Sequence, residues 1–238
     1  FNRDNPETYP DSDNLKQGSR IVSYGEDAPE SEAWGLRSDA KGSCWLAYGD
    51  ELILPVKALL IEGIHNALNA LAALALAEEL GLPRDSSLQA LTKFRGLPHR
   101  CQRVKELDGV AWINDSKGTN VGATESAIAG LAPSLEGKLV LILGGQGKGG
   151  VFEQLRDGVH AYARALVLIG DDAIRIEKAL GDLVPVFYAH SMHEAVQCAQ
   201  LQAKPGDAVL LSPACASFDW FDDFNQRGDV FTACVEAL

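Results

Sequence analysis

Polar side chains able to bind an anion follow three apolar runs of the sequence. Segment 115–120 reads Asp-Ser-Lys-Gly-Thr-Asn and combines a carboxylate, an ammonium group and two hydroxyls. Segment 144–150 is rich in glycine and contains Lys148, and segment 212–217 consists of small residues and ends at Ser217. Ammonium groups, hydroxyls and free backbone N–H groups are the donors that bind carboxylates and phosphates. The three segments together predict one site for an anionic ligand.

A mainly parallel sheet would bring these segments to one edge. Apolar runs over 110–114, 138–143 and 207–211 lead into them and are typical of buried strands. Asn120 is placed to cap a helix over 121–131, which completes a strand, a loop and a helix. Ligands of open α/β folds bind at the carboxyl ends of the strands. We therefore expect the polar segments to line that edge.

The rest of the second half continues the alternation of strands and helices. Further strands are predicted over 102–107, 165–169 and 184–188, and helices over 151–162, 173–180, 192–202 and 219–238. This order predicts the α/β class, with a Rossmann-like, mainly parallel sheet covered by helices on both faces.

The first 95 residues show a different pattern. Short runs over 20–24, 33–38, 44–48 and 51–55 predict antiparallel strands, and helical spacing follows over 63–80 and 86–94. Asp85 or Ser86 would cap the second helix. Gly96 and Pro98 then interrupt both periodicities, so we expect a boundary there, with domains over 1–95 and 96–238.

The composition restricts the partners of the chain. Its 238 residues include 33 acidic side chains and 21 lysines and arginines, for a net charge of -12. This acidity argues against a nucleic-acid polymer or an anionic membrane as partner, although a small anion needs only a few local cations. Five separated cysteines without a Cys-x-x-Cys pair indicate reduced thiols in a cytoplasmic protein. No residues show metal-ligand spacing, so no metal site is expected within the chain.

Segment 144–150 allows two interpretations. Its glycines match the dinucleotide-binding pattern G-x-G-x-x-G at Gly145, Gly147 and Gly150. Asp171 and Asp172 follow roughly 20 residues later, as that pattern requires, so a nicotinamide-dinucleotide-binding module is one interpretation. A flexible loop between a strand and a helix is the other. In either case a cation at Lys148 suits a carboxylate or a phosphate.

Four further residues have both a functional and a structural interpretation. Asn66 and Asn69 share one face near the start of the first long helix, where their amides could read a purine edge or cap the helix. Arg100 follows the predicted boundary and could clamp a phosphate or lie in a solvated linker. Phe224 could contact a ligand or belong to the core.

Taken in order, these segments resemble the Mur ligase family, and within it the enzymes that add D-glutamate. The residues that carry the resemblance are Gly63-x-His65-Asn66-x-x-Asn69-x-x-Ala72-Ala73, Gly96 to Arg100, Trp112 to Asn120, Gly144-Gly145-x-Gly147-Lys148 and Leu211 to Ser217. They span nearly all of the chain, so together they are far more specific than any one of them.

The resemblance implies a cytoplasmic, monomeric ligase that uses ATP and Mg²⁺. Such an enzyme would join D-glutamate to UDP-N-acetylmuramoyl-L-alanine through an acyl phosphate. Asn66, Asn69, Arg100 and Asp115 would bind ATP. Lys117, Thr119, Lys148, Ser217 and Phe224 would bind D-glutamate or the product.

The chain departs from the family in a decisive way. No Gly-Lys pair is followed by Ser or Thr, so the phosphate loop is missing. The sequence starts at Phe1, and we expect it to begin inside a longer protein and to be inactive alone. Residues 1–95 would then be the C-terminal part of a central α/β ATPase domain. The dinucleotide-binding module and a related ligase, such as a folylpolyglutamate synthase, remain alternatives.

Overall fold

A computed structural model describes residues 1–11, 13, 15–61 and 63–238. The chain divides into two compact units, Phe1–Arg95 and Gly96–Leu238. In the described part of the chain, no helix combines the length and apolar character needed to cross a membrane.

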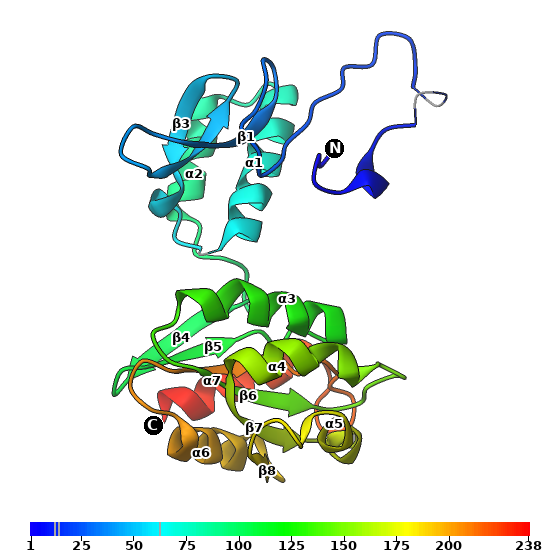
Figure 1. Ribbon diagram of the computed structural model, residues 1–238, viewed down its shortest axis with the longest axis vertical. Coiled ribbons are helices and arrows are strands. Elements are labelled where there is room, and N and C mark those ends of the chain that lie inside the picture. Colours follow the sequence, from blue (N-terminus) through cyan, green and yellow to red (C-terminus); the bar gives the residue numbers. More distant parts are fainter. Residues whose placement is uncertain (12, 14, 62) are drawn as a thin grey trace. The chain divides into compact units, whose positions relative to one another are not determined.

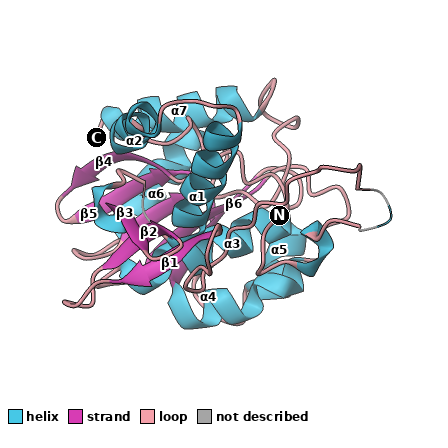
Figure 2. Cartoon of the chain, turned by 90° about the horizontal axis from the view of Figure 1, so that it is seen from above, coloured by secondary structure: helices cyan, strands magenta, loops and turns pink. Residues whose placement is uncertain are grey.

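The first unit packs a small antiparallel sheet against two helices (Figure 2). Its strands are β1 (Trp34–Ser38), β2 (Cys44–Tyr48) and β3 (Glu51–Pro55), and its helices are α1 (Ile64–Glu79) and α2 (Arg84–Lys93). Trp34, Leu46 and Leu71 are almost fully buried between them. Burial of about 25 cal/mol per Å² of apolar surface makes these side chains the main source of stability here.

Two expectations for the first unit are wrong. Residues 20–24 form no strand, because only Tyr24 pairs with its neighbours, through single bridges to Asn2 and Trp34. Val22 and Tyr24 are partly buried against the core of this unit, while Ile21 is exposed. The second helix begins at Arg84, after Pro83, and no side chain caps it. Proline's fixed φ suits this start, so neither Asp85 nor Ser86 is needed as a cap.

The second unit has the predicted Rossmann-like architecture, with a six-stranded sheet in the order β4-β5-β9-β6-β7-β8. The strands are β4 (Gln102–Leu107), β5 (Val110–Asn114), β6 (Leu139–Gly144), β7 (Ala163–Ile169), β8 (Val186–Tyr188) and β9 (Ala208–Leu211). β4 and β5 form an antiparallel hairpin, and every other pairing is parallel.

Helices cover both faces of this sheet (Figure 1). The helices are α3 (Val121–Leu131), α4 (Arg156–Tyr162), α5 (Ala173–Leu180), α6 (Met192–Gln202) and α7 (Phe224–Glu236). Alternate residues of β6 serve the two cores: Leu141 packs with α3, α4 and α5, and Ile142 packs with α6 and α7. The sheet is therefore buried on both sides, as its nearly continuous apolar strands predict.

The ends of some helices differ from the prediction. Asn120 caps α3 as expected, since its side chain accepts a hydrogen bond from the backbone N–H of Ala123. The helix predicted over 151–162 is split into a short 3₁₀ turn, Phe152–Leu155, and α4. The last helix starts at Phe224 rather than at 219, because Asp223 caps it through the N–H of Gln226.

Candidate functional site

The three polar segments meet at the carboxyl edge of the second unit's sheet. They follow β5, β9 and β6, which are neighbouring parallel strands. The N–H of Ala214 donates to the carbonyl of Gly118 at 2.9 Å, which joins the first segment to the third. Gln146 and Ala216 exchange two backbone hydrogen bonds of 2.9 Å, which join the second to the third. The segments therefore form one connected surface.

Asp115 is a buried carboxylate within this surface. The Ser212 hydroxyl donates to its Oδ2 at 2.7 Å, and the backbone N–H of Cys101 donates to its Oδ1 at 3.2 Å. Burial raises the pKa of Asp115, while the bond from Ser212 and the charge of the exposed Arg100 oppose that rise. A carboxylate held in this way sits in one orientation, which suits it to accept a hydrogen bond from a ligand hydroxyl.

Lys117 and Thr119 extend from the same segment. The ammonium of Lys117 lies over the ring of Phe224, 3.8 Å from its centroid. The ring of Phe224 also lies edge-on to the imidazole of His99, at 6.2 Å between centroids. Phe224 is partly buried, and its ring contacts a cation of the predicted site.

Lys148 lies at the exposed tip of the glycine-rich segment, with a φ of 44°. Its ammonium lies 5.0 Å from the centroid of the Phe218 ring. Ser217, directly before Phe218, is buried, and its carbonyl accepts the N–H groups of Trp220 and Phe221 at 3.2 and 2.9 Å. Ser217 therefore starts a turn that precedes α7.

Gly144, Gly145 and Gly147 of segment 144–150 are packed too closely against neighbouring residues to carry a side chain. A Cβ on Gly145 would lie 2.3 Å from the carbonyl oxygen of Ala216. Asp172 accepts a hydrogen bond from the N–H of Gly147 and pairs with Arg175 at 2.8 Å, so it serves this loop and its own helix. The backbone N–H of Asp171 bonds to Asp219 at 3.0 Å. The close packing of Gly145 and the engagement of the Asp172 carboxylate disfavour the dinucleotide-binding interpretation, which needs a loop open to pyrophosphate.

Sequence reasoning missed a buried arginine that supports the surface from α7. Arg227 is 1% exposed, and its guanidinium donates to the hydroxyl and carbonyl of Ser116 at 2.9 and 2.8 Å and to the carbonyl of Cys215 at 3.0 Å. Burial lowers the pKa of Arg227 to about 10, so the group remains charged at neutral pH. The available signal was an arginine beside Gly228 on a face otherwise lined by Phe231 and Val235.

Asn114 is a second missed support. Its amide nitrogen donates to the carbonyl of Gly228 at 2.9 Å and to the hydroxyl of Thr232 at 3.1 Å, and lies 3.1 Å from Nδ1 of His99. Its oxygen accepts the backbone N–H of Ser116 at 3.0 Å. The end of β5 is therefore tied to α7 immediately before the polar segment begins.

Asn66 and Asn69 lie in the first unit, at the beginning of α1. Their side chains are 3.5 Å apart, between the amide nitrogen of Asn69 and the oxygen of Asn66. Arg100 and the other predicted site residues belong to the second unit. A site shared by the two sets stays a prediction.

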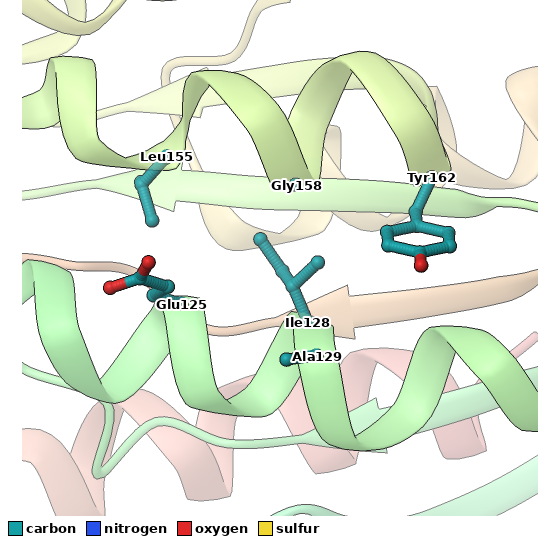
Figure 3. A pocket seen from close by; sticks show the side chains of 6 residues that line it. All are labelled: Glu125, Ile128, Ala129, Leu155, Gly158 and Tyr162. Carbon is teal, nitrogen blue, oxygen red and sulfur yellow. The ribbon is translucent and has the colours of Figure 1, made fainter.

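A small pocket of about 140 Å³ lies elsewhere in the second unit, between α3 and α4 (Figure 3). Its walls are formed by Glu125, Ile128, Ala129, Leu155, Gly158 and Tyr162. No predicted site residue contributes to it.

Comparison with known proteins identifies the family. Residues 99–215 match the family described as "Mur ligase, glutamate ligase domain". The UDP-N-acetylmuramoylalanine--D-glutamate ligase of Legionella pneumophila (strain Lens) is 53% identical over 238 residues, which is 100% of this chain and 53% of that protein. The chain belongs to the Mur ligase family.

A second relative agrees with the first. The Pseudomonas fluorescens enzyme of the same name is 49% identical over 238 residues, again all of this chain and 52% of the relative. The chain thus spans about half the length of these curated Mur ligases.

Solved structures share the fold. The UDP-N-acetylmuramate-alanine ligase MurC of Thermotoga maritima has a TM-score of 0.64 at 18% identity, covering 91% of this chain and 48% of that one. The Mycobacterium tuberculosis folylpolyglutamate synthase complexed with ADP also has a TM-score of 0.64, at 16% identity, covering 92% of this chain and 56% of that one. At such low identity the likeness establishes the fold and leaves the substrate open.

Proposed function

We propose that the protein to which this chain belongs is an ATP-dependent ligase that adds D-glutamate to UDP-N-acetylmuramoyl-L-alanine. The observation that carries the proposal is the gathering of Lys117, Thr119, Lys148 and Ser217 on connected loops at one sheet edge. D-glutamate has two carboxylates, and two ammonium groups with nearby hydroxyls are suitable partners for them. The names of relatives that are 49–53% identical over the whole chain support this amino acid over the glutamate of a folate chain.

The reaction would proceed in two steps. The carboxylate of UDP-N-acetylmuramoyl-L-alanine attacks the γ-phosphorus of ATP and forms an acyl phosphate, with ADP as leaving group. The amine of D-glutamate then attacks the acyl carbon, and phosphate leaves as the amide forms. The role of the second unit would be to hold D-glutamate so that its amine faces that carbon, because fixed orientation removes much of the entropic cost of the second step.

ATP would be bound by four residues. Asn66 and Asn69 would contact adenine, while Arg100 and Asp115 would bind phosphate and ribose. The exposed Arg100 can contact a phosphate without first breaking an ion pair, since it forms none with the described residues. The buried, oriented Asp115 can accept from a ribose hydroxyl.

Mg²⁺ would be held by parts of the protein other than this chain. Among residues 1–11, 13, 15–61 and 63–238, no three His, Cys, Asp or Glu side chains gather as a metal site requires. We therefore assign no step to a metal bound here. We also propose that the enzyme acts in the cytoplasm, as a monomer, and that residues 1–95 are the end of its ATP-binding domain.

An isotope experiment tests this function in the full-length protein. UDP-N-acetylmuramoyl-L-alanine labelled with oxygen-18 in its carboxylate is incubated with ATP, Mg²⁺ and D-glutamate. An acyl phosphate transfers one labelled oxygen to the phosphate released, so labelled phosphate and amide should form in equal amounts. Unlabelled phosphate accompanying amide formation would contradict the acyl phosphate, and absence of amide would contradict the ligase.

A further inference from the structure

Each lysine assigned to D-glutamate lies against an aromatic ring. The ammonium of Lys117 is 3.8 Å from the centroid of Phe224, and that of Lys148 is 5.0 Å from the centroid of Phe218. Neither lysine forms an ion pair with an acidic side chain in the part of the chain that the structure describes. In a protein with 33 acidic residues, both cations are therefore held without being neutralised.

Phe218 has no other structural explanation. Its side chain is 60% exposed, so it does not serve the core. It follows Ser217, in the segment whose Ala216 exchanges two backbone hydrogen bonds with Gln146, two residues before Lys148. The ring and the ammonium thus extend from two loops that backbone hydrogen bonds fix to each other, which keeps the two side chains within reach of one another.

The chemistry of the contact leaves the lysine available to a ligand. A phenyl ring attracts a cation through its quadrupole and carries no charge of its own. A lysine ammonium has three N–H donors, so the face turned away from the ring can still donate to a carboxylate. An aspartate in the place of Phe218 would instead compete with the substrate for the same cation.

We propose that Phe218 is a positioning residue that holds the ammonium of Lys148 in place for a carboxylate of the incoming amino acid. The inference rests on the proposed function, which assigns Lys148 to that substrate. Lys117 on Phe224 is the matching pair, so the two carboxylates would meet two cations that are each oriented by a ring. Phe218 contributes through Lys148 and does not itself take part in the reaction.

The test uses the full-length enzyme and measures KM for D-glutamate, KM for ATP and kcat. Phe218→Leu should raise KM for D-glutamate about 2- to 5-fold, the range expected for an exposed cation–π contact, with kcat and KM for ATP unchanged. Phe218→Tyr keeps the ring and should restore the wild-type KM. Tyr162→Leu, on α4 and 39% exposed, is the control for loss of a surface ring and should change nothing.

A double variant separates this inference from the function on which it rests. In a Lys148→Ala background, Phe218→Leu should have no further effect on KM for D-glutamate, since the ring then has no cation to hold. A wild-type KM for Phe218→Leu, equal impairment of the Leu and Tyr variants, or additive effects in the double variant would each overturn the role of Phe218. An unchanged KM for D-glutamate in Lys148→Ala alone would instead overturn the proposed substrate site.

Discussion

At the scale of single residues, the site combines one buried carboxylate with cations near the surface. Asp115 is held by Ser212 and Cys101, whereas the ammonium groups of Lys117 and Lys148 lie against aromatic rings. The residue types of all three were evident from the sequence, and so was their position after strands. The surroundings of the two lysines were not evident, because Phe218 and Phe224 approach them from distant parts of the chain.

Lys148→Ala should mainly raise KM for D-glutamate in the full-length enzyme. Loss of a charge-assisted contact costs about 1.5–3 kcal/mol, or roughly 10- to 150-fold. Steady-state kinetics with each substrate varied in turn provide the measurement. An unchanged response to D-glutamate, or NAD binding that the variant loses, would refute the assignment.

Arg100→Ala should weaken ATP far more than D-glutamate. The exposed guanidinium would lose its contact to phosphate, and a loss of tenfold or more in KM for ATP is expected from about 1.5 kcal/mol. Arg103→Ala is a suitable control, since Arg103 forms an exposed ion pair with Glu106 on the protein surface. The opposite order of effects would place Arg100 at the amino-acid site.

The buried Asp115 makes a specific prediction about stability and pH. Its pKa in the folded protein is raised above 3.8, so the folded state binds its proton more tightly than the unfolded state does. Its contribution to the free energy of unfolding should therefore fall as pH rises from about 4 through the raised value, and recover as pH falls.

Urea denaturation of the 238-residue chain at several pH values measures this contribution as the difference between wild type and Asp115→Asn. The difference is used because other carboxylates, such as that of Asp207, have lowered pKa values and act in the opposite direction. A difference that does not vary with pH would show that Asp115 titrates normally.

At the scale of elements, the second unit could be predicted almost completely. Its strands are apolar runs separated by polar loops, and this local pattern is sufficient to locate them. The prediction failed where tertiary contacts decide. Residues 20–24 have strand-like composition, but among them only Tyr24 forms β-bridges. The last helix, α7, begins later than predicted, after its N-cap residue Asp223.

The packing of α7 against the site also could not be predicted from the sequence. Gly228 lets the helix approach His99, because a Cβ at this position would lie 2.2 Å from Nδ1 of the imidazole. Asn114 bonds to the carbonyl of the same glycine. A glycine within a predicted helix suggests close packing at that position, but it does not indicate which residue packs there.

Gly228→Ala should therefore lower the free energy of unfolding by about 1–3 kcal/mol through overpacking. Gly122→Ala is a matched control, since it lies in α3 and its nearest contact would be 3.7 Å away. The control should raise stability by about 0.5–1 kcal/mol through helix propensity. Equal effects of the two substitutions in urea denaturation would contradict the packing argument.

At the scale of the whole molecule, the chain belongs to the Mur ligase family and spans about half the length of its curated relatives. The amino-acid site that we propose lies in its second unit, and two of the proposed adenine contacts lie in its first. The sequence of neither unit contains the phosphate loop on which phosphoryl transfer depends. The family was evident in the sequence because its motifs recur in order over nearly the whole chain.

The most direct measurement is incorporation of radiolabelled glutamate into the UDP-linked product by the full-length protein. With ATP, Mg²⁺ and UDP-N-acetylmuramoyl-L-alanine present, D-glutamate should be incorporated, L-glutamate should not, and the 238-residue chain alone should give only the background of a reaction without protein. Incorporation of L-glutamate in preference to D-glutamate, or sustained incorporation by the 238-residue chain alone, would contradict the account.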